Sequence, residues 1–421
     1  MRLSAQSVFT GLWRRPDFLK LWGGRTVSTL GSQIMQVALP LAAVLVLHAS
    51  PFQMGVLRAV AAMPDFLFGF PAGAWVDRVR RRPLMIGTDL CQAVVVGSVP
   101  VAALLGLLHL EQLYVVAFLS GALTLVFDIA SQSYVPTLLS SEDLVEGNSK
   151  LAASNSLSSL LGPAVGGSLV QLVTAPITIT LNSISFLFSA LMLATIGGTE
   201  PAARTAGTGS GFAAFWRSIG QGLRFMVENR VLLALSAAAG LFNLFDGMIF
   251  AVYILYASRE LAIPPALLGV IIAAGGVGGL LGAFVAGWVS RRLTAGRALL
   301  AALVVATVGE ALIAFASGPL GLTASLLLAA EVLVGLGAAV FSINYLTLRQ
   351  LLTPVELQGR VHATNRTIIT GLVPVGALVG GVLGQLLGLR APLIVGAAGT
   401  LLAAVLLFAS PLRTWRAPGQ P

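Results

Sequence analysis

Long apolar runs constrain this chain more than any other feature of its sequence. Stretches of about 20 residues, each long enough to cross a bilayer as a helix, recur from residue 20 to residue 413. Of the 421 residues, 57% are apolar and only 10% are charged, whereas soluble domains carry about 25% charged residues. The runs lack the alternating pattern of a membrane β-barrel. We therefore expect an all-α integral membrane protein, because a helix satisfies its own backbone hydrogen bonds in lipid.

The apolar runs divide into twelve predicted spans. They cover residues 20–47, 53–75, 84–107, 112–137, 147–173, 176–197, 231–257, 266–290, 297–317, 321–347, 361–387 and 391–411. Short connections rich in Arg and Lys stay in the cytoplasm, and most of the 25 basic residues fall on one side of this arrangement. We therefore expect a multi-pass protein of a bacterial inner membrane, with both termini cytoplasmic and no cleaved signal peptide.

The net charge of +9 comes from the basic residues of these connections. It therefore reflects the membrane topology, and we expect no nucleic-acid partner. The three histidines and the single cysteine, Cys91, are scattered along the chain, which predicts no metal site. Neither lysine follows a glycine, so the phosphate-binding loop of many ATPases is absent. The acids are dispersed and no nucleophile stands near a base. We expect no catalytic residues, no cofactor and no enzymatic activity.

The two halves of the chain repeat each other. Trp75-Val76-Asp77-Arg78 is matched by Trp288-Val289-Ser290-Arg291, and Gly166-Gly167 is matched at almost the same offset by Gly380-Gly381. The repeat predicts two pseudo-symmetric six-helix bundles, residues 1–197 and 231–421. Parallel repeats of this kind place a binding site at their interface, near the middle of the bilayer.

The connection 198–230 is the one long segment outside the spans, and we expect it to be cytoplasmic. The stretch 197–211 is rich in Gly, Ala and Thr and is typical of a flexible linker. Apolar residues then recur at helical spacing, which predicts an amphipathic helix on the inner membrane surface. They are Phe212, Phe215, Trp216, Ile219, Leu223 and Met226. The alternative is a simple tether between the halves.

The connection after the second span carries a recognisable motif, Gly73-Ala74-Trp75-Val76-Asp77-Arg78-Val79-Arg80-Arg81-Arg82. It resembles the pattern G-x-x-x-D-R-x-G-R-R of the major facilitator superfamily, with Arg80 in place of a glycine. Three further stretches, Arg25–Gln33, Phe127–Ala130 and Gly359–Val361, are similar to the drug and siderophore exporter branch that contains macrolide efflux and enterobactin export proteins. The resemblance covers essentially the whole chain.

This resemblance implies a gate in which Asp77 faces the amino terminus of span 11 and the loop latches the two halves together. The implied gating residues are Gly73, Asp77, Arg78, Arg81, Arg82 and Arg360. A carboxylate at a helix amino terminus gains up to about 1 kcal/mol from the helix dipole, and Arg360 is a candidate partner. The alternative, anchoring by positive charge alone, explains the arginines but not the aspartate among them.

Span 5 carries a stretch that is similar to the antiporter motif of the family. Its residues are Gly162, Pro163, Gly166 and Gly167, while Ser158 replaces the leading glycine of the motif. Small residues at this spacing let helices approach closely, and the proline could bend the span. Many drug antiporters also have an arginine in the middle of span 4, which this chain lacks.

Charged residues inside the spans are the candidate functional groups. Five acids lie well within apolar runs (Asp65, Asp128, Asp246, Glu310 and Glu331), and three arginines lie within or near the ends of spans (Arg25, Arg58 and Arg366). Each central charge costs about 2.5–3.5 kcal/mol on insertion scales, so such residues usually face a cavity or a partner. Five acids against three arginines favour cationic or neutral cargo.

The roles of these residues follow partly from the resemblance, in which spans 1, 4, 7 and 10 line the cavity. That favours Asp128, Asp246 and Glu331 for proton coupling or cargo binding and disfavours Glu310. Arg58 and Asp65 are seven residues apart on one helix face and are placed to pair, directly or through water. The alternative for each acid is a structural hydrogen bond. Asn243, one turn before Asp246, is a candidate cargo contact.

Taken together, these features predict a monomeric secondary active exporter of amphipathic, drug-like small molecules that works by alternating access in the lipid bilayer. A proton gradient is the expected energy source. One alternative is export of an anionic siderophore or metabolite, with Arg25, Arg58 or Arg366 as its contact. Another is lysophospholipid transport without a proton requirement. A membrane sensor would need a soluble domain, and no stretch outside the spans is long enough to form one.

Overall fold

The computed structural model of the chain describes residues 12, 15–69, 71–197, 212–410 and 412. Twelve long helices occupy the positions of the twelve predicted spans. They are α1 (Pro16–Leu45), α2 (Pro51–Phe68), α4 (Arg81–Leu104), α5 (Leu110–Leu138), α6 (Leu144–Leu172), α7 (Ala175–Ala194), α9 (Arg230–Arg259), α10 (Pro265–Arg292), α11 (Ala295–Phe315), α12 (Leu320–Leu352), α13 (Val355–Leu387) and α14 (Arg390–Ala409). Two further helices, α3 (Pro71–Val76) and α8 (Phe212–Glu228), are shorter.

In the described part of the chain, ten of these helices are long and apolar enough to cross a membrane. The two long helices outside this group are α2, which carries Arg58 and Asp65, and α6, which is rich in serine. The predicted span 53–75 is also divided in the structure, because α2 ends at Phe68 and α3 begins at Pro71. Both α2 and α6 have other helices on several sides.

Local sequence signals fix several helix starts. The Ser50 side chain accepts a hydrogen bond from the Gln53 backbone N–H, and the Gln53 side chain accepts one from the Ser50 backbone N–H. This reciprocal arrangement is a capping box, and Pro51 follows at the first helical position, where proline loses no hydrogen bond. The Asn229 side chain likewise caps α9 by accepting from the N–H groups of Val231 and Leu232.

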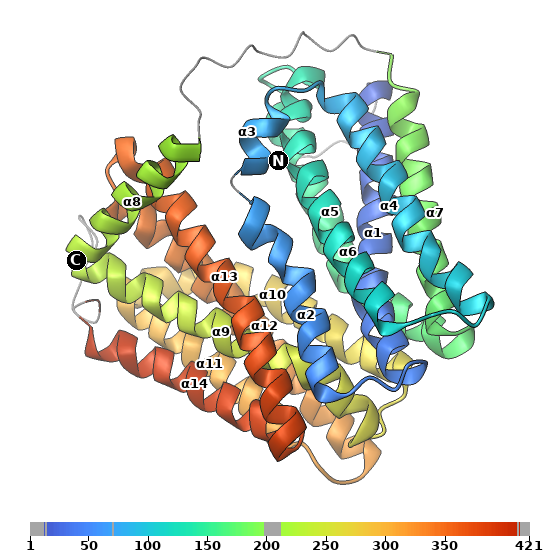
Figure 1. Ribbon diagram of the computed structural model, residues 1–421. Coiled ribbons are helices and arrows are strands. Elements are labelled where there is room, and N and C mark those ends of the chain that lie inside the picture. Colours follow the sequence, from blue (N-terminus) through green and yellow to red (C-terminus); the bar gives the residue numbers. More distant parts are fainter. Residues whose placement is uncertain (1–11, 13–14, 70, 198–211, 411, 413–421) are drawn as a thin grey trace, which may run out of the picture.

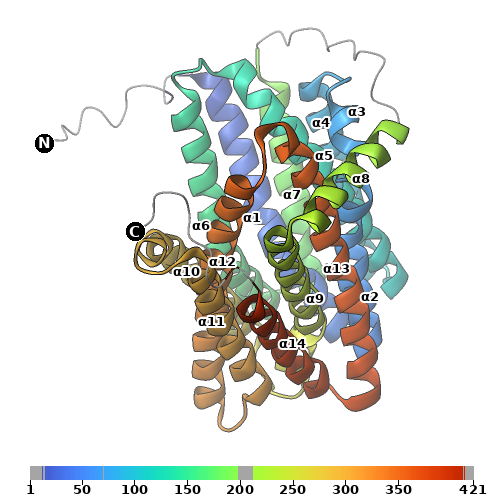
Figure 2. The same cartoon turned by 90° about the vertical axis from the view of Figure 1, so that its left-hand side faces the viewer.

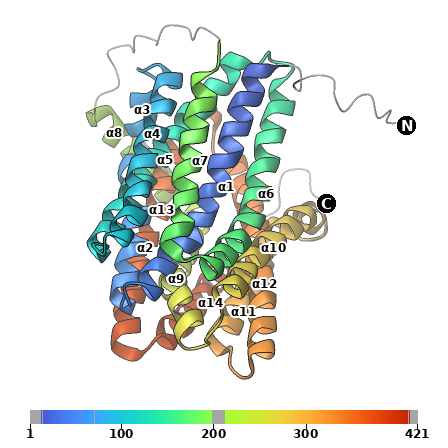
Figure 3. The same cartoon turned by 90° about the vertical axis from the view of Figure 1, so that its right-hand side faces the viewer.

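The long helices form two bundles, α1–α7 on one side and α9–α14 on the other (Figures 1–3). The bundles approach each other at the end where α2 and α10 begin, which we call the closed end. They spread apart at the opposite end, which carries α3 and α8 and which we call the open end (Figure 1). The bundles contact each other most extensively where α2 meets α13 and where α6 meets α10, and α9 also contacts α2 and α1.

Glycines make both of these junctions possible. A Cβ atom on Gly167 of α6 would lie 2.2 Å from the carbonyl oxygen of Pro265, and one on Gly55 of α2 would lie 2.6 Å from that of Ala377. Gly269 and Gly381 stand opposite them, and a Cβ atom on these would lie 2.3 Å and 2.9 Å, respectively, from the nearest backbone atom. Backbone therefore meets backbone across the interface, as small residues allow in membrane helices. The Ala266 N–H also donates to the Gln171 side chain across the α6–α10 junction.

The segment 198–211, predicted as a flexible linker, lies outside the described residues. The predicted helix that follows is present as α8, and it packs against α13 and α9. A Cβ atom on Gly222 would lie 2.8 Å from the carbonyl oxygen of Arg360, and Met226 is buried. One face of α8 therefore packs against the second bundle at the open end. Leu223 and Val227 remain exposed, and the side chains of 212–219 are outside the described ones.

Candidate functional site

A cavity of about 810 Å³ lies between the two bundles. Its wall is formed by α1, α2, α4, α5, α6 and α7 of the first bundle and by α9, α10 and α13 of the second. Binding pockets for drug-sized molecules span about 300–1,000 Å³, so the cavity is large enough for one such molecule. Because both bundles contribute to the wall, any movement of one against the other changes the cavity.

Five charged residues line this cavity: Arg58, Asp65, Asp128, Asp246 and Arg366. All five were predicted from the sequence as intramembrane charges. They come from α2, α5, α9 and α13 and meet at one cavity. This explains why positions so far apart in the chain carry charges inside membrane spans, where contact with lipid would be costly.

Asp128 is held by an arginine of its own bundle. Arg25 Nη2 lies 3.1 Å from Asp128 Oδ1, and Arg25 Nη1 donates to Ser131 Oγ at 2.5 Å. The Arg25 side chain is only 11% exposed, whereas that of Asp128 is 45% exposed. The arginine therefore lies behind the aspartate and orients its carboxylate toward the cavity.

The charges on α2 face the opposite bundle. Arg366 Nη2 of α13 lies 3.4 Å from Asp65 Oδ1. Arg58 stacks 5.6 Å above the ring of Phe250 on α9 and interacts electrostatically with Asp246 on the same helix. The direct partners of Arg58 and Asp65 in this structure therefore lie on other helices, and pairing of the two through water stays a prediction. Their spacing does place them on one helix face, but that face meets other helices that supply a partner to each.

The charges at and directly behind the cavity wall are balanced, because Arg25, which pairs with Asp128 behind the wall, joins Arg58 and Arg366 against the three aspartates. The expected excess of five acids does not occur at this site, because neither glutamate lines the cavity. Glu331 on α12 is buried beside Gly275 of α10. Glu310 on α11 is only 2% exposed, and Thr400 of α14 lies beside its carboxyl group.

The two glutamates nevertheless form an acidic group with Asp246 inside the second bundle. Asp246 interacts electrostatically with both of them. Glu331 also interacts with the buried Tyr253, and Glu310 faces Thr400 of α14. Asp246 is the one member of this group on the cavity wall. It therefore stands between the cavity and two buried carboxyl groups.

Uncharged polar residues complete the cavity wall, and the sequence reasoning missed them. Thr124 Oγ1 donates to Gln92 Oε1 at 3.0 Å, and Asn182 Nδ2 lies 3.0 Å from Met35 Sδ. All of these residues line the cavity. Amide side chains inside predicted spans are the signal that could have identified them. Asn243 is not among the lining residues, and its amide donates to the Ala239 carbonyl of its own helix at 2.9 Å.

The predicted latch contact is not made in this conformation. The Asp77 side chain is 68% exposed, and its described ion pair is a long one of 3.9 Å to Arg81 at the start of α4. Arg360 instead donates to Gln221 Oε1 of α8. Gly73 has open space where a Cβ atom would lie. Since the bundles are apart at the open end, the loop and the start of α13 have no opportunity to meet.

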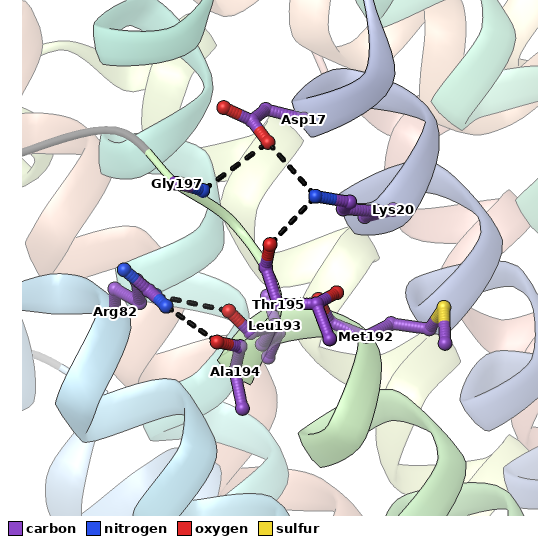
Figure 4. Close-up of polar contacts among 8 residues, drawn as sticks. All are labelled: Asp17, Lys20, Arg82, Met192, Leu193, Ala194, Thr195 and Gly197. Carbon is purple, nitrogen blue, oxygen red and sulfur yellow. Dashed lines mark hydrogen bonds and ion pairs between the residues drawn. The ribbon is translucent and has the colours of Figure 1, made fainter.

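Arg82, another predicted gating residue, contacts its own bundle (Figure 4). Its Nε donates to the Leu193 carbonyl at 2.9 Å, and its Nη2 donates to the Ala194 carbonyl at 2.7 Å. Lys20 Nζ donates to the Thr195 carbonyl at 2.6 Å. Asp17 accepts from Lys20 and from the Gly197 N–H (Figure 4). Two cations thus satisfy the carbonyl groups at the end of α7, where helices leave them unpaired.

Arg82→Gln is expected to lower the free energy of unfolding by about 1.5–3 kcal/mol, since hydrogen bonds to a charged donor are lost at the end of α7. Thermal unfolding of the purified protein measures the change. Arg80→Gln is the control, because Arg80 is an exposed arginine of the same loop. Equal stability of the two variants would contradict an anchoring role for Arg82.

The antiporter-like motif of α6 divides between two contacts. Gly162 and Gly166 pack against Gln33 and Ile34 of α1, within the first bundle. Gly167 packs against Gly269 of α10, across the interface, and Pro163 lines the cavity. The motif therefore joins the core of one bundle to the junction between both. Among the residues that the structure describes, no group of His, Cys, Asp and Glu could hold a metal ion.

Comparison with known proteins shows which family has this architecture. Residues 7–420 match the model of a family described as transmembrane secretion effector. The chain is 27% identical over 384 residues to the uncharacterized MFS-type transporter YfiS of Bacillus subtilis (strain 168), an alignment that covers 88% of this chain and 87% of YfiS. It is 28% identical over 397 residues to the multidrug efflux pump Tap of Mycolicibacterium fortuitum, covering 91% and 92% of the two chains. The predicted resemblance to drug exporters is thereby confirmed.

Solved structures confirm the predicted fold class. An inward-facing bacterial homologue of the iron transporter ferroportin superposes with a TM-score of 0.77 at 20% identity, covering 96% of this chain and 100% of that one. An outward-facing structure of a bacterial ferroportin homologue gives a TM-score of 0.56 at 21% identity, covering 93% and 98%.

Proposed function

Because the chain belongs to the transmembrane secretion effector family of major facilitator transporters, we propose that it is a secondary active exporter of amphipathic, drug-like small molecules, driven by protons. The family is one of membrane transporters and not of enzymes. The multidrug pump Tap is a relative over nine-tenths of the chain. In this proposal the chain works as a monomer in a bacterial inner membrane, with the open end in the cytoplasm.

The observation that carries this proposal is the cavity between the bundles. It is closed at one end by backbone contacts between glycines, and it contains apolar, polar and balanced charged groups. Aromatic and aliphatic side chains such as Phe186, Phe250 and Leu57 offer contact area to an apolar cargo. Amide and hydroxyl groups add directional contacts. Neutral or zwitterionic amphipathic cargo fits this wall as well as cationic cargo does.

Anionic cargo is the less favoured alternative. Arg25 and Arg366 are each paired with an aspartate, and Arg58 interacts with Asp246. An anion would have to displace a carboxylate from its partner before it could use any of them. Breaking a pair in a site away from bulk water leaves an uncompensated charge, which is costly.

Asp246 is the proposed proton-coupling residue. It combines exposure to the cavity with electrostatic contact to Arg58 across the interface and to Glu331 and Glu310 within its bundle. In the proposed cycle, a proton that arrives from outside neutralises Asp246 and weakens its attraction to Arg58. The α2–α9 contact and the cargo site then change together. Glu331 and Glu310 serve as further proton-holding groups behind it.

Asp77 is the proposed latch residue of the outward-facing state, in which the open end closes. Asp77→Asn is expected to slow transport several-fold without changing the melting temperature, because, among the residues that the structure describes, the exposed carboxylate forms one long ion pair. Turnover of the reconstituted protein and its thermal unfolding are the two measurements. Unchanged turnover would remove the latch from the mechanism.

The proposed function is tested in inside-out vesicles that contain the protein. With an imposed pH gradient, acidic inside, we expect the vesicles to accumulate a fluorescent amphipathic cation. Adding a protonophore should abolish this accumulation. Uptake of a lysophospholipid without any gradient would support lipid transport instead. Accumulation that equals that of vesicles lacking the protein, for cations and neutral dyes alike, would contradict the exporter proposal.

A further inference from the structure

Arg349, near the end of α12, is a buried arginine outside the central cavity. The residue is only 8% exposed. Its Nη2 donates to His362 Nδ1 of α13 at 2.7 Å, and its guanidinium lies 5.7 Å from the ring centre of Tyr345. These contacts hold the planar group in one orientation between two helices that are joined by a short turn.

This arginine differs from those of the central cavity in its electrostatic surroundings. Arg25, Arg58 and Arg366 each interact with an aspartate. In the described part of the chain, no carboxylate lies within ion-pair distance of Arg349. The charged groups that act on its neighbour His362 are Arg349 and Arg366, both cations. A buried cation without a counter-charge is costly, so the site attracts an anion.

A pocket of about 280 Å³ opens beside this arginine. It is lined by Leu346, Arg349, Gln350, Thr353, Gln358 and His362. The pocket opens on the protein surface, because Gln350 and His362 are exposed. Its volume lies at the lower limit for ligand pockets. It therefore suits a single small anionic group and not a complete drug-like molecule.

The hydrogen bond to Arg349 also sets the role of the histidine. An arginine N–H can only donate, so Nδ1 of His362 accepts, and the proton of the neutral ring lies on Nε2. His362 then offers a donor at Nε2, while the guanidinium has five N–H groups, more than its contacts with His362 and Tyr345 use. Guanidinium forks of this kind bind phosphate and carboxylate oxygens in pairs.

We propose that Arg349 and His362, brought together between the ends of α12 and α13, form a binding site for a phosphate or carboxylate group at the open end of the second bundle. The site is separate from the central cavity and does not depend on the proposed export activity. A phosphate group could come from free phosphate or from the headgroup of an anionic lipid.

The test uses the full-length protein purified in detergent and titrated with inorganic phosphate by isothermal calorimetry. Arg349→Gln and His362→Ala are expected to weaken phosphate binding, Arg349→Gln by at least about tenfold, the effect of one lost charge-assisted contact. Arg297→Gln is the matched control, since it removes one exposed positive charge from the same bundle. His362 is exposed, so its replacement keeps the test valid if the buried Arg349 proves necessary for folding.

A second arm separates the two sources of phosphate. The protein is placed in nanodiscs of phosphatidylcholine, with or without phosphatidylglycerol, and its melting temperature is recorded. Stabilisation by phosphatidylglycerol that both variants lose and the control keeps would identify a lipid headgroup as the ligand, even if free phosphate does not bind. The proposal is overturned if neither probe binds, or if both variants behave like Arg297→Gln with every probe.

Discussion

Asp246→Asn is expected to abolish gradient-driven uptake in inside-out vesicles while cargo still binds to the purified protein. Asparagine keeps the size of the side chain but cannot exchange a proton. Asp246 is also the acid that joins the cavity wall to Glu331 and Glu310 and that faces Arg58 across the interface. Uptake is measured as fluorescence accumulation under an imposed pH gradient, and binding is measured by tryptophan quenching in detergent.

The control for this prediction is Asp89→Asn. Asp89 is a buried acid on α4 that does not line the cavity, so its replacement tests whether loss of any intramembrane carboxyl group has the same effect. Glu331→Gln and Glu310→Gln are expected to reduce uptake less than Asp246→Asn, because both lie behind Asp246. Full gradient-driven uptake by Asp246→Asn would contradict the proposed coupling.

Gly269→Ala is expected to shift the protein strongly away from the inward-facing conformation. Its Cβ atom would lie 2.3 Å from the Pro163 carbonyl oxygen across the α6–α10 junction, so the closed end cannot keep its present packing. Overpacking of this kind costs about 1–3 kcal/mol. If that cost falls on the inward-facing conformation only, the ratio of the outward-facing to the inward-facing population rises by about 5- to 150-fold.

Labelling of a cysteine placed at Ile254 measures this shift. Ile254 lines the cavity near the closed end and is buried, and the native Cys91, which is exposed, is replaced by serine in the same background. A membrane-impermeant maleimide added from outside should label Gly269→Ala faster than the parent. Gly376→Ala is the control, because Gly376 packs against Leu244 within one bundle. It should lower stability without exposing Ile254, and equal labelling of all three proteins would contradict the predicted role of the junction.

The helices could be predicted from the sequence because hydropathy and capping are local. Each apolar run is long enough to cross a bilayer by itself, and signals such as Ser50-Pro51 set the start of a helix whatever lies around it. The division of span 2 into α2 and α3 was not predicted. The hydropathy window averages over the break between Phe68 and Pro71.

The partners of the charged residues could not be predicted in the same way. Spacing along α2 places Arg58 and Asp65 on one face, but it does not say which helix lies opposite that face. Phe250 and Asp246 lie more than 180 residues further along the chain. Likewise, nothing near Arg82 in sequence indicates that the end of α7 needs its guanidinium. Such contacts depend on which helices pack together, and the periodicity of apolar residues within one helix does not identify its neighbours.

Glu310 illustrates the limit of arguing from resemblance. Its span belongs to those expected outside the cavity, and it indeed does not line the cavity. The structure nevertheless buries its carboxyl group in the second bundle, where it interacts with Asp246. The resemblance predicts the position of the whole helix. What a residue contacts depends also on the face of that helix on which the residue lies.

Distances between spin labels test the central claim, that the two bundles move against each other around the shared cavity. In the background without Cys91, one label pair is placed at the exposed residues Val145 and Val355 of the open end, and another at Leu172 and Leu386 of the closed end. When a proton gradient and cargo are supplied to the reconstituted protein, we expect the open-end distance to shorten while the closed-end distance lengthens. If both distances stay fixed, or if both change in the same direction, the two bundles do not alternate access and the proposed transport cycle is wrong.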